Sequence, residues 1–297
     1  MLFVNVILPV FLLAFVGFFF ERKTKPDMAT LANATLYLFA PALVFSSLLK
    51  QTVEFDIVGK LALFTLLYTG ILCIAAYLIA RMRRFDDGAT RALALTAPMI
   101  NVGNFGLPLV FFAYGEGALD ISIVIFVLFN IPLGTLAVYI AQGNGANWRQ
   151  ALLNTAKIPI FHSIVLAFLC KGFDLYPPEF LLRATELLGQ AAIPTMLILL
   201  GMQLARSSVR DSWGFFTLAT SLRLIAGPLL AIALTAILEL DGLTRKVVIL
   251  QTSTPSAVMP LLYAVRFNTR PDLVSGAILL STLCSAFTLT FLLYWLG

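Results

Sequence analysis

Apolar runs about as long as a bilayer is thick recur along this whole chain. A helix needs roughly 20 residues to cross the hydrocarbon core of a membrane. Ten runs near that length cover residues 2–20, 30–49, 57–80, 92–114, 119–141, 158–175, 180–205, 213–238, 246–265 and 272–296. Charged residues make up 12% of the chain, about half of their share in soluble domains. An all-α integral membrane protein with ten transmembrane helices is therefore predicted.

Basic residues concentrate in alternate connections between the expected spans. Thirteen of the 20 Lys and Arg residues follow spans one, three, five, seven and nine, as in "ERKTK" after span one and "RMRR" after span three. Because cytoplasmic loops of membrane proteins carry an excess of Lys and Arg, both termini are expected to lie outside. These loops explain the net charge of +5, and no nucleic-acid partner is expected.

Prolines recur in the two halves of the chain at a nearly constant offset. Three pairs lie 150, 153 and 152 residues apart: Pro9 with Pro159, Pro41 with Pro194, and Pro108 with Pro260. This offset predicts a first five-helix repeat over 1–141, a short cytoplasmic connection over 142–157 and a second repeat over 158–297. An odd number of spans turns the second copy upside down, and such inverted repeats are typical of secondary transporters.

Helix breakers interrupt the fourth and ninth expected spans at corresponding positions. The fourth span contains "NVGNFGLPL" and the ninth contains "TSTPSAVMPLL". When Pro108 is aligned with Pro260, Gly103 falls opposite Pro255. Proline removes a backbone donor, and glycine permits unusual dihedral angles. Broken backbone is tolerated at membrane depth only where it lines a cavity or is buried in protein, so this pair predicts a binding site.

The polar residues at these interruptions are the candidates for substrate binding. They are Asn101, Gly103, Asn104, Thr254, Pro255 and Ser256, with Gly106, Pro108 and Pro260 as crossover or hinge positions. The N-termini of the half-helices are expected to face one cavity, where their positive dipole ends favour an anion. A small molecule with a carboxylate is the expected ligand. The alternative is a kinked, tightly packed pair of helices.

Polar residues elsewhere in the spans add further candidates. Arg223 lies about ten residues into the eighth span, where an ionisable group is costly. It is a candidate for anion binding, and the alternative is a contact with a carboxylate, a helix end or backbone carbonyls. Four neutral residues are candidates for lining the cavity or for hydrogen bonds between helices: Asn33, Thr35, Asn130 and Gln190.

Two titratable side chains have structural interpretations beside functional ones. Glu186 is a candidate for proton coupling, although a contact with Arg183 near the membrane surface is favoured. His162 is the single histidine, and interfacial packing is favoured over a proton relay. One histidine and three separated cysteines provide no metal-ligand spacing, so no metal is expected. The chain lacks a Walker A sequence, H-E-x-x-H and G-x-S-x-G, so neither a cofactor nor an enzymatic activity is expected.

Four stretches together give the chain a specific resemblance. "NVGNFGLPLVFFAYG", "TPSAVMPLLYAVRF", "PALVFSSL" and "AAIPTMLILLGMQLA" resemble the auxin efflux carrier family, which includes plant PIN carriers and bacterial organic-acid permeases. The resemblance implies ten helices in two inverted five-helix repeats, with crossed broken helices four and nine. It further implies a scaffold of spans 1, 2, 6 and 7 and a transport domain of spans 3–5 and 8–10.

The resemblance also implies that one residue of this chain contacts the substrate. Asn101 lies seven residues before Pro108, the spacing of the asparagine that contacts the substrate carboxylate in PIN carriers, and Pro255 precedes Pro260 by five residues as in the family. The connection over 142–157 is much shorter than the hydrophilic loop of the plant carriers, so the chain resembles the bacterial members. A bacterial inner membrane and a homodimer follow from the same resemblance.

The function expected from these features is secondary transport of small organic anions by elevator-type alternating access. Malate and malonate are favoured as substrates, and auxin-like acids stay open. The alternatives are a sodium-coupled symporter of a bile-acid-like anion and a non-transporting membrane receptor on the same fold. The membrane potential alone does about 2.3 kcal/mol of work per charge per 100 mV, so uniport, H⁺ coupling and Na⁺ coupling all stay open.

Overall fold

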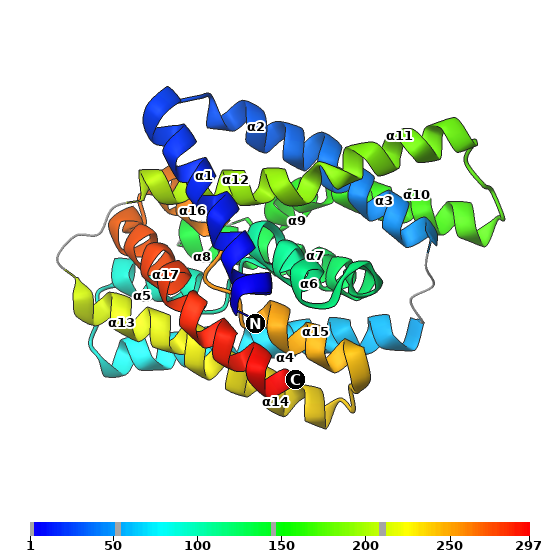
Figure 1. Cartoon of the computed structure of the whole chain (residues 1–297). Coiled ribbons are helices and arrows are strands. Elements are labelled where there is room, and N and C mark those ends of the chain that lie inside the picture. The colour runs from blue at the N-terminus through cyan, green and yellow to red at the C-terminus, as the bar shows by residue number, and fades with distance from the viewer. Residues whose placement is uncertain (1–2, 51–54, 144–146, 208–211) are drawn as a thin grey trace.

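The computed structural model describes residues 3–50, 55–143, 147–207 and 212–297, which form helices joined by short connections (Figure 1). No β-strand occurs in these ranges. Position 2 of the first expected span, positions 144–146 of the expected connection and the loop residue Arg210 lie outside them.

Seven helical stretches of the described chain are long and apolar enough to cross a membrane. They are Phe3–Thr24, Met28–Lys50, Asp56–Met82, Glu116–Gln142, Glu179–Arg206, Trp213–Ile237 and Pro271–Leu296, and they fall on expected spans one, two, three, five, seven, eight and ten. An all-helical protein with several membrane-crossing helices is thus confirmed. The ten-helix inverted repeat stays a prediction, because the other three expected spans are not long continuous helices.

The seven stretches contain most of the helical elements. In chain order these are η1 (Phe3–Ile7), α1 (Leu8–Thr24), α2 (Met28–Ala34), η2 (Thr35–Phe39), α3 (Ala40–Lys50), α4 (Phe55–Met82), η4 (Glu116–Ala118), α7 (Leu119–Gly134), α8 (Leu136–Gln142), α11 (Glu179–Gln190), α12 (Ala192–Arg206), α13 (Trp213–Ser221), η5 (Leu222–Ala226), α14 (Gly227–Ile237) and α17 (Pro271–Leu296).

The remaining elements are shorter. The fourth expected span is divided into α5 (Asp87–Thr96), then η3 (Val102–Gly106) with α6 (Leu107–Tyr114), and the ninth into α15 (Gly242–Thr252) and α16 (Met259–Arg266). The sixth is the 14-residue α10 (Pro159–Gly172). The connection expected at 142–157 contains a helix, α9 (Trp148–Ala156), and its Trp148 is exposed.

Prolines explain where the helices widen. Four five-residue π-helical turns, η1, η2, η3 and η5, each end two residues before a proline: Pro9, Pro41, Pro108 and Pro228. A proline cannot donate to the carbonyl four residues earlier, and its ring crowds that carbonyl. A turn with bonds over five residues accommodates the crowding, as in the bond from the Gly106 amide to the Asn101 carbonyl at 2.9 Å.

The helices pack as two groups. Group one consists of α1–α3 and α10–α12, where α1 runs along α12 and α3 packs against α10 and α11 (Figure 1, upper part). Glycine makes the first contact possible: a Cβ at Gly201 would overlap the carbonyl of Ala14, and a Cβ at Gly17 would overlap that of Ile198. Small residues let membrane helices approach this closely.

Group two consists of α4–α8 and α13–α17. Within it α4 packs against α5 and α7, α13 against α17, and α15 against α14 and α7. The two groups meet where α12 contacts η3 and α6, and where α3 contacts α7. The interruptions of the fourth and ninth expected spans therefore belong to group two, and the first of them lies against group one.

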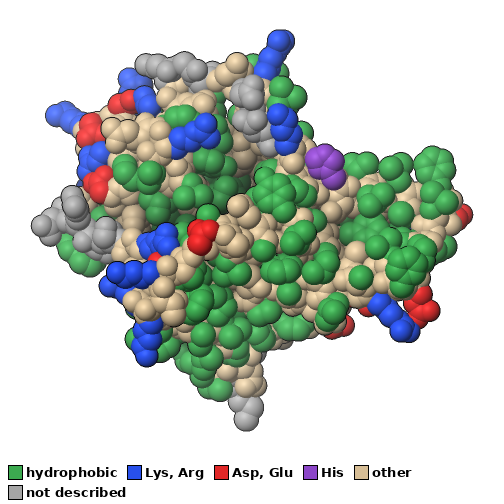
Figure 2. All heavy atoms as spheres, turned by 90° about the horizontal axis from the view of Figure 1, so that it is seen from above, with side chains coloured by type: hydrophobic (Ala, Val, Ile, Leu, Met, Phe, Trp, Pro, Cys, Tyr) green, Lys and Arg blue, Asp and Glu red, His purple; other side chains and the backbone are tan. Residues whose placement is uncertain are grey.

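The outer surface suits a lipid environment. Many large hydrophobic side chains are exposed, including Leu66, Phe287 and Phe291. Figure 2 shows hydrophobic side chains over much of one face, with most of its Lys and Arg side chains toward one end. A hydrocarbon core outside the protein satisfies such a surface, whereas water does not.

Candidate binding site at two interrupted helices

The two interruptions lie against each other and exchange backbone hydrogen bonds. The Asn101 amide donates to the Pro255 carbonyl at 2.9 Å, and the Ala257 amide donates to the Met99 carbonyl at 2.8 Å. Ile100 and Ser256 form an antiparallel bridge between these bonds. Each broken helix thus satisfies backbone groups that the other leaves without helical partners. We call residues 97–101 and 253–258 the helix crossing.

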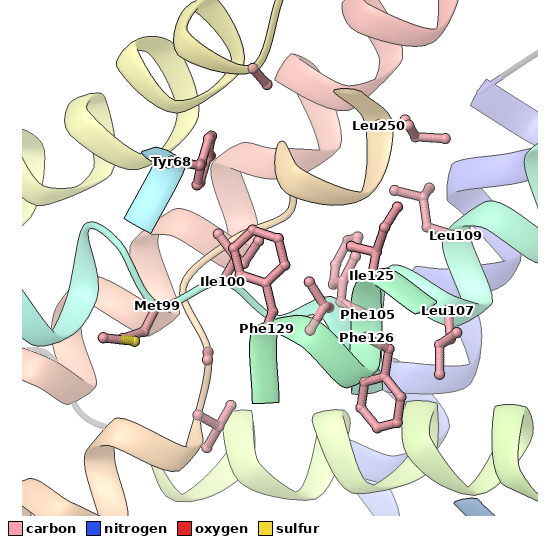
Figure 3. Close-up of a cluster of buried hydrophobic side chains, with 14 of the residues drawn as sticks. Tyr68, Met99, Ile100, Phe105, Leu107, Leu109, Ile125, Phe126, Phe129 and Leu250 are labelled. Carbon is pink, nitrogen blue, oxygen red and sulfur yellow. The ribbon is translucent and has the colours of Figure 1, made fainter. Parts of the chain in front are cut away.

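Buried apolar side chains lie around the helix crossing (Figure 3). The Tyr68 ring stacks on Phe64 with centroids 5.4 Å apart and meets Phe129 edge to face at 5.8 Å. Phe105 of η3 meets Phe11 of α1 edge to face at 5.9 Å. Aromatic contacts thus join α4 to α7 beside the crossing and join η3 to group one.

Arg223 lies beside the carbonyl ends of both upstream half-helices. Its side chain is fully buried, with Nη1 donating to the Ala97 carbonyl at 2.7 Å and Nη2 donating to the Thr252 carbonyl at 2.7 Å. The Tyr68 hydroxyl accepts from Nη2 and donates to the Thr252 carbonyl at 2.8 Å. The negative ends of α5 and α15 therefore share one cation.

This position places Arg223 outside the cavity that the sequence suggested for it. The guanidinium occupies space that a side chain at position 227 would otherwise fill. A Cβ at Gly227, one turn later, would overlap Nη2 and lie 2.8 Å from the Tyr68 hydroxyl. Of the alternatives that the sequence left open, the structure shows Arg223 in contact with helix ends and backbone carbonyls.

Gln251 ties the crossing to a third helix, and sequence reasoning missed it. Its side chain is fully buried, and Nε2 donates to the Val102 carbonyl at 3.1 Å and to the Ser122 carbonyl at 3.0 Å. Gly106 leaves the space, since a Cβ there would lie 2.9 Å from the Gln251 Cγ. The available signal was an amide directly before the second interruption in an otherwise apolar run.

A cavity of about 330 Å³ lies between the helix crossing and group one. Residues 100–104 and 257–259 line one side, so the N-terminal ends of η3 and α16 border the cavity. The other walls come from α2 and η2, α7, α10 and α12. Most of these side chains are apolar, and a few amides supply polar atoms, a composition typical of small-molecule sites.

Six of the residues selected from sequence line this cavity: Asn33, Thr35, Asn101, Gly103, Asn104 and Asn130. Asn101 is 6% exposed, and its side-chain Nδ2 has no hydrogen-bond partner. The Asn104 amide donates to Gln203 Oε1 on α12 at 3.5 Å, a contact between the two groups. Asn130 and Thr35 donate to the carbonyls of Phe126 and Leu31 in their own helices.

Several other selected residues hold the crossing together. The Thr254 hydroxyl donates to the Gln251 carbonyl at 2.7 Å, and the Ser256 hydroxyl donates to the Thr96 carbonyl at 2.8 Å. Neither lines the 330 Å³ cavity, and nor does Pro255, whose carbonyl accepts from Asn101. Pro260 lies in the first turn of α16, where a missing amide hydrogen leaves no helical bond unmade, and Pro108 lies at the start of α6 directly after the π-helical turn η3.

The remaining candidates lie elsewhere. Gln190 and Glu186 line a second cavity, where Glu186 pairs with Lys50 Nζ at 3.1 Å. The expected contact between Glu186 and Arg183 is wrong, because Arg183 pairs with Glu179 one turn earlier on α11. His162 is exposed near the start of α10 and contacts the Ile158 carbonyl at 3.3 Å.

Two interrupted helices that meet beside a cavity with a few polar groups place this chain among membrane transport proteins with discontinuous helices. The family model described as "Membrane transport protein" matches residues 2–151 and 146–293. The chain belongs to this family.

Individual relatives agree. An "Uncharacterized transporter" of Methanothermobacter thermautotrophicus is 31% identical over 89% of this chain and 88% of its own length. A "Putative malonate transporter" of Rhizobium meliloti is 26% identical over 98% of this chain and 94% of its own. The "Probable auxin efflux carrier component 1c" of Oryza sativa is 23% identical over 46% of this chain and 23% of its own. The resemblance to auxin efflux carriers is thus confirmed, and the protein is a membrane transporter, in line with the expectation that it is no enzyme.

Proposed function

We propose that the chain is a secondary transporter of small organic anions and binds the substrate carboxylate at the helix crossing. The observation that carries this proposal is the Asn101 side-chain amide, which is buried at the 330 Å³ cavity without a hydrogen-bond partner. An unsatisfied buried donor is unfavourable, and a carboxylate oxygen satisfies it. The malonate named for the Rhizobium meliloti relative is a dicarboxylate of suitable size.

Charge separation at the crossing supports an anionic ligand. Each helix N-terminus is equivalent to roughly half a positive charge, and the ends of η3 and α16 both border the cavity. The opposite, negative ends of α5 and α15 contact the Arg223 guanidinium instead. The positive helix ends at the crossing therefore border the cavity, whereas the negative helix ends contact Arg223 outside the cavity.

The two helix groups suit an elevator-type movement. Group one, from spans 1, 2, 6 and 7, would be the scaffold, and group two, from spans 3–5 and 8–10, would carry the crossing along it. The proposal includes the inverted repeats 1–141 and 158–297, both termini outside, and a bacterial inner membrane. A homodimer is part of the same proposal. The direct polar contact across the cavity from Asn104 to Gln203 is long at 3.5 Å and would be readily exchanged.

Counterflow of labelled malonate into proteoliposomes tests the proposal. Wild-type protein should show saturable exchange, and Asn101→Ala should abolish most of it because the carboxylate loses its amide donor. Asn5→Ala is the matched control, since Asn5 is exposed on η1 away from the cavity. Binding without exchange would indicate a receptor, and exchange that requires Na⁺ would indicate a sodium symporter; either result would replace the proposal.

A further inference from the structure

A second cavity, of about 470 Å³, lies between the same two helix groups. This second cavity lies at the opposite ends of α7 and α12, two helices that also line the 330 Å³ cavity. On α7 it is lined by Asp120, whereas the 330 Å³ cavity is lined by Asn130; on α12 it is lined by Ile193, whereas the other is lined by Gln203. The interface between the groups is thus hollowed at both ends.

Asp120 is an unusual member of this lining. It is 5% exposed, and its Oδ2 is buried without a hydrogen-bond partner. A buried carboxylate normally has a counter-ion or several donors, because removing its charge from water is strongly unfavourable. An ionisable side chain in a membrane-crossing helix marks a functional site by default. Sequence reasoning missed Asp120 because it is the second residue of the fifth expected span and therefore does not lie deep within it.

The basic side chain of this lining is paired with a carboxylate other than Asp120. Lys50 lines the cavity from α3 but pairs with Glu186 of α11 at 3.1 Å. Glu116 of η4 also lines the cavity and is exposed. Lys171 of α10 attracts Asp120 through its charge. The lining contains no charged residue of α1, α6 or α12.

These acidic groups do not form a metal site. No cluster of three His, Cys, Asp or Glu residues with suitable geometry occurs among the described residues. A buried carboxylate oxygen without a hydrogen-bond partner, such as Oδ2 of Asp120, can take up a proton. Uptake converts the carboxylate of Asp120 to a carboxylic acid, and release of the same proton restores it.

We propose that Asp120 is the proton-binding site of this transporter and couples anion transport to the pH gradient. The inference rests on the proposed function. If group two slides along group one, Asp120 must pass apolar residues of the interface such as Leu13 and Ile193. With an anion at the crossing, a charged Asp120 would add a second negative charge to the moving group, so the loaded crossing moves with the neutral acid. The anion and the proton are then both released, and the empty crossing returns with the carboxylate as its only added charge, so one proton accompanies each anion.

The first α7 turn and the anion site are mechanically linked. The Ser122 carbonyl, two residues after Asp120, accepts a hydrogen bond from Gln251, which also binds the Val102 carbonyl at the start of η3. A displacement of this end of α7 is thus transmitted to the helix crossing through one buried side chain.

Proteoliposomes with the membrane potential held at zero by valinomycin and equal K⁺ test the inference. With the outside acidic by one pH unit, one proton per anion sustains about tenfold accumulation of labelled malonate. Wild-type protein should approach this value, with protein-free liposomes as the blank. Asp120→Asn should accumulate none but keep malonate counterflow at equal pH, because asparagine resembles the neutral acid. Glu116→Gln, in the same cavity, should behave as wild type.

The outcomes separate this inference from the proposed function. If wild type shows no malonate counterflow, the proposed function fails. If it shows counterflow without accumulation in the pH gradient, transport stands and proton coupling is overturned. Accumulation by Asp120→Asn overturns the assignment to Asp120, and so does loss of its counterflow, because the carboxyl group would then be required for movement or folding itself.

Discussion

The backbone amide of Asn101 donates a hydrogen bond to the carbonyl of Pro255, which lies 154 positions later in the chain and in the second interrupted span. This bond positions the asparagine whose side-chain amide faces the cavity without a partner. The residue proposed to bind the anion is thus held by the second interrupted helix as well as its own. Changes on either helix should therefore reach the binding site.

Arg223→Gln should be among the most destabilising single changes. The shorter, neutral side chain cannot reach the Ala97 and Thr252 carbonyls together, so both buried helix ends lose their charged donor. Loss of a buried hydrogen bond from a charged donor costs about 1.5–3 kcal/mol for each bond. Thermal unfolding in detergent should show a clearly lower midpoint.

Arg183→Gln is the control for this change. Its ion pair with Glu179 is exposed on α11, and such pairs contribute about 0–1 kcal/mol. Similar midpoints for Arg183→Gln and Arg223→Gln would contradict the role of Arg223 at the helix ends.

Substitutions at two glutamines should distinguish an effect on stability from an effect on malonate affinity. Gln251→Leu removes the side-chain hydrogen bonds to the Val102 and Ser122 carbonyls, and each such bond contributes about 0.5–1.5 kcal/mol. Its unfolding midpoint should fall. Gln203→Leu removes a polar atom of the cavity wall, so malonate affinity should weaken while the midpoint changes little. The reverse pattern would show that the two roles are assigned wrongly.

The contact between α1 and α12 should tolerate no side chain at its glycines. In Gly201→Ala the new methyl group overlaps the Ala14 carbonyl, so the helices must separate and the unfolding midpoint should drop. Gly59→Ala in α4 has no atom within 4 Å of its new methyl, and alanine favours a helix by up to about 1 kcal/mol. That variant should unfold at the same or a higher temperature, and equal losses in both would contradict the packing.

The interruptions could be found from sequence because proline and glycine act locally. Pro108 and Pro255 prevent regular helical bonding whatever surrounds them, so the breaks, the family and Asn101 were all accessible. The partners of Ser256 and Arg223 were not, because they depend on which helix ends meet in space. The burial of Asp120 depends likewise on packing between α7 and α3.

Spacing along the chain also predicted the wrong partner where a tertiary contact competes with a contact within one helix. Glu186 and Arg183 are three residues apart on one helix, a favourable separation, yet Glu186 pairs with Lys50 from α3. Gln190 was a candidate for lining the anion cavity because it is a neutral polar residue within an apolar span, but it lines the second cavity instead. Neutral polar residues in apolar helices indicate a buried polar environment without indicating which one.

Calorimetric titration of malonate into the purified protein tests the binding site most directly. Loss of the Asn101 amide donor should cost about 1–3 kcal/mol, so we expect Asn101→Ala to weaken binding by roughly 5- to 150-fold. Asn101→Asp should abolish it through repulsion, while Asn5→Ala should match wild type. Unchanged affinity in Asn101→Ala would contradict an anion site at the helix crossing.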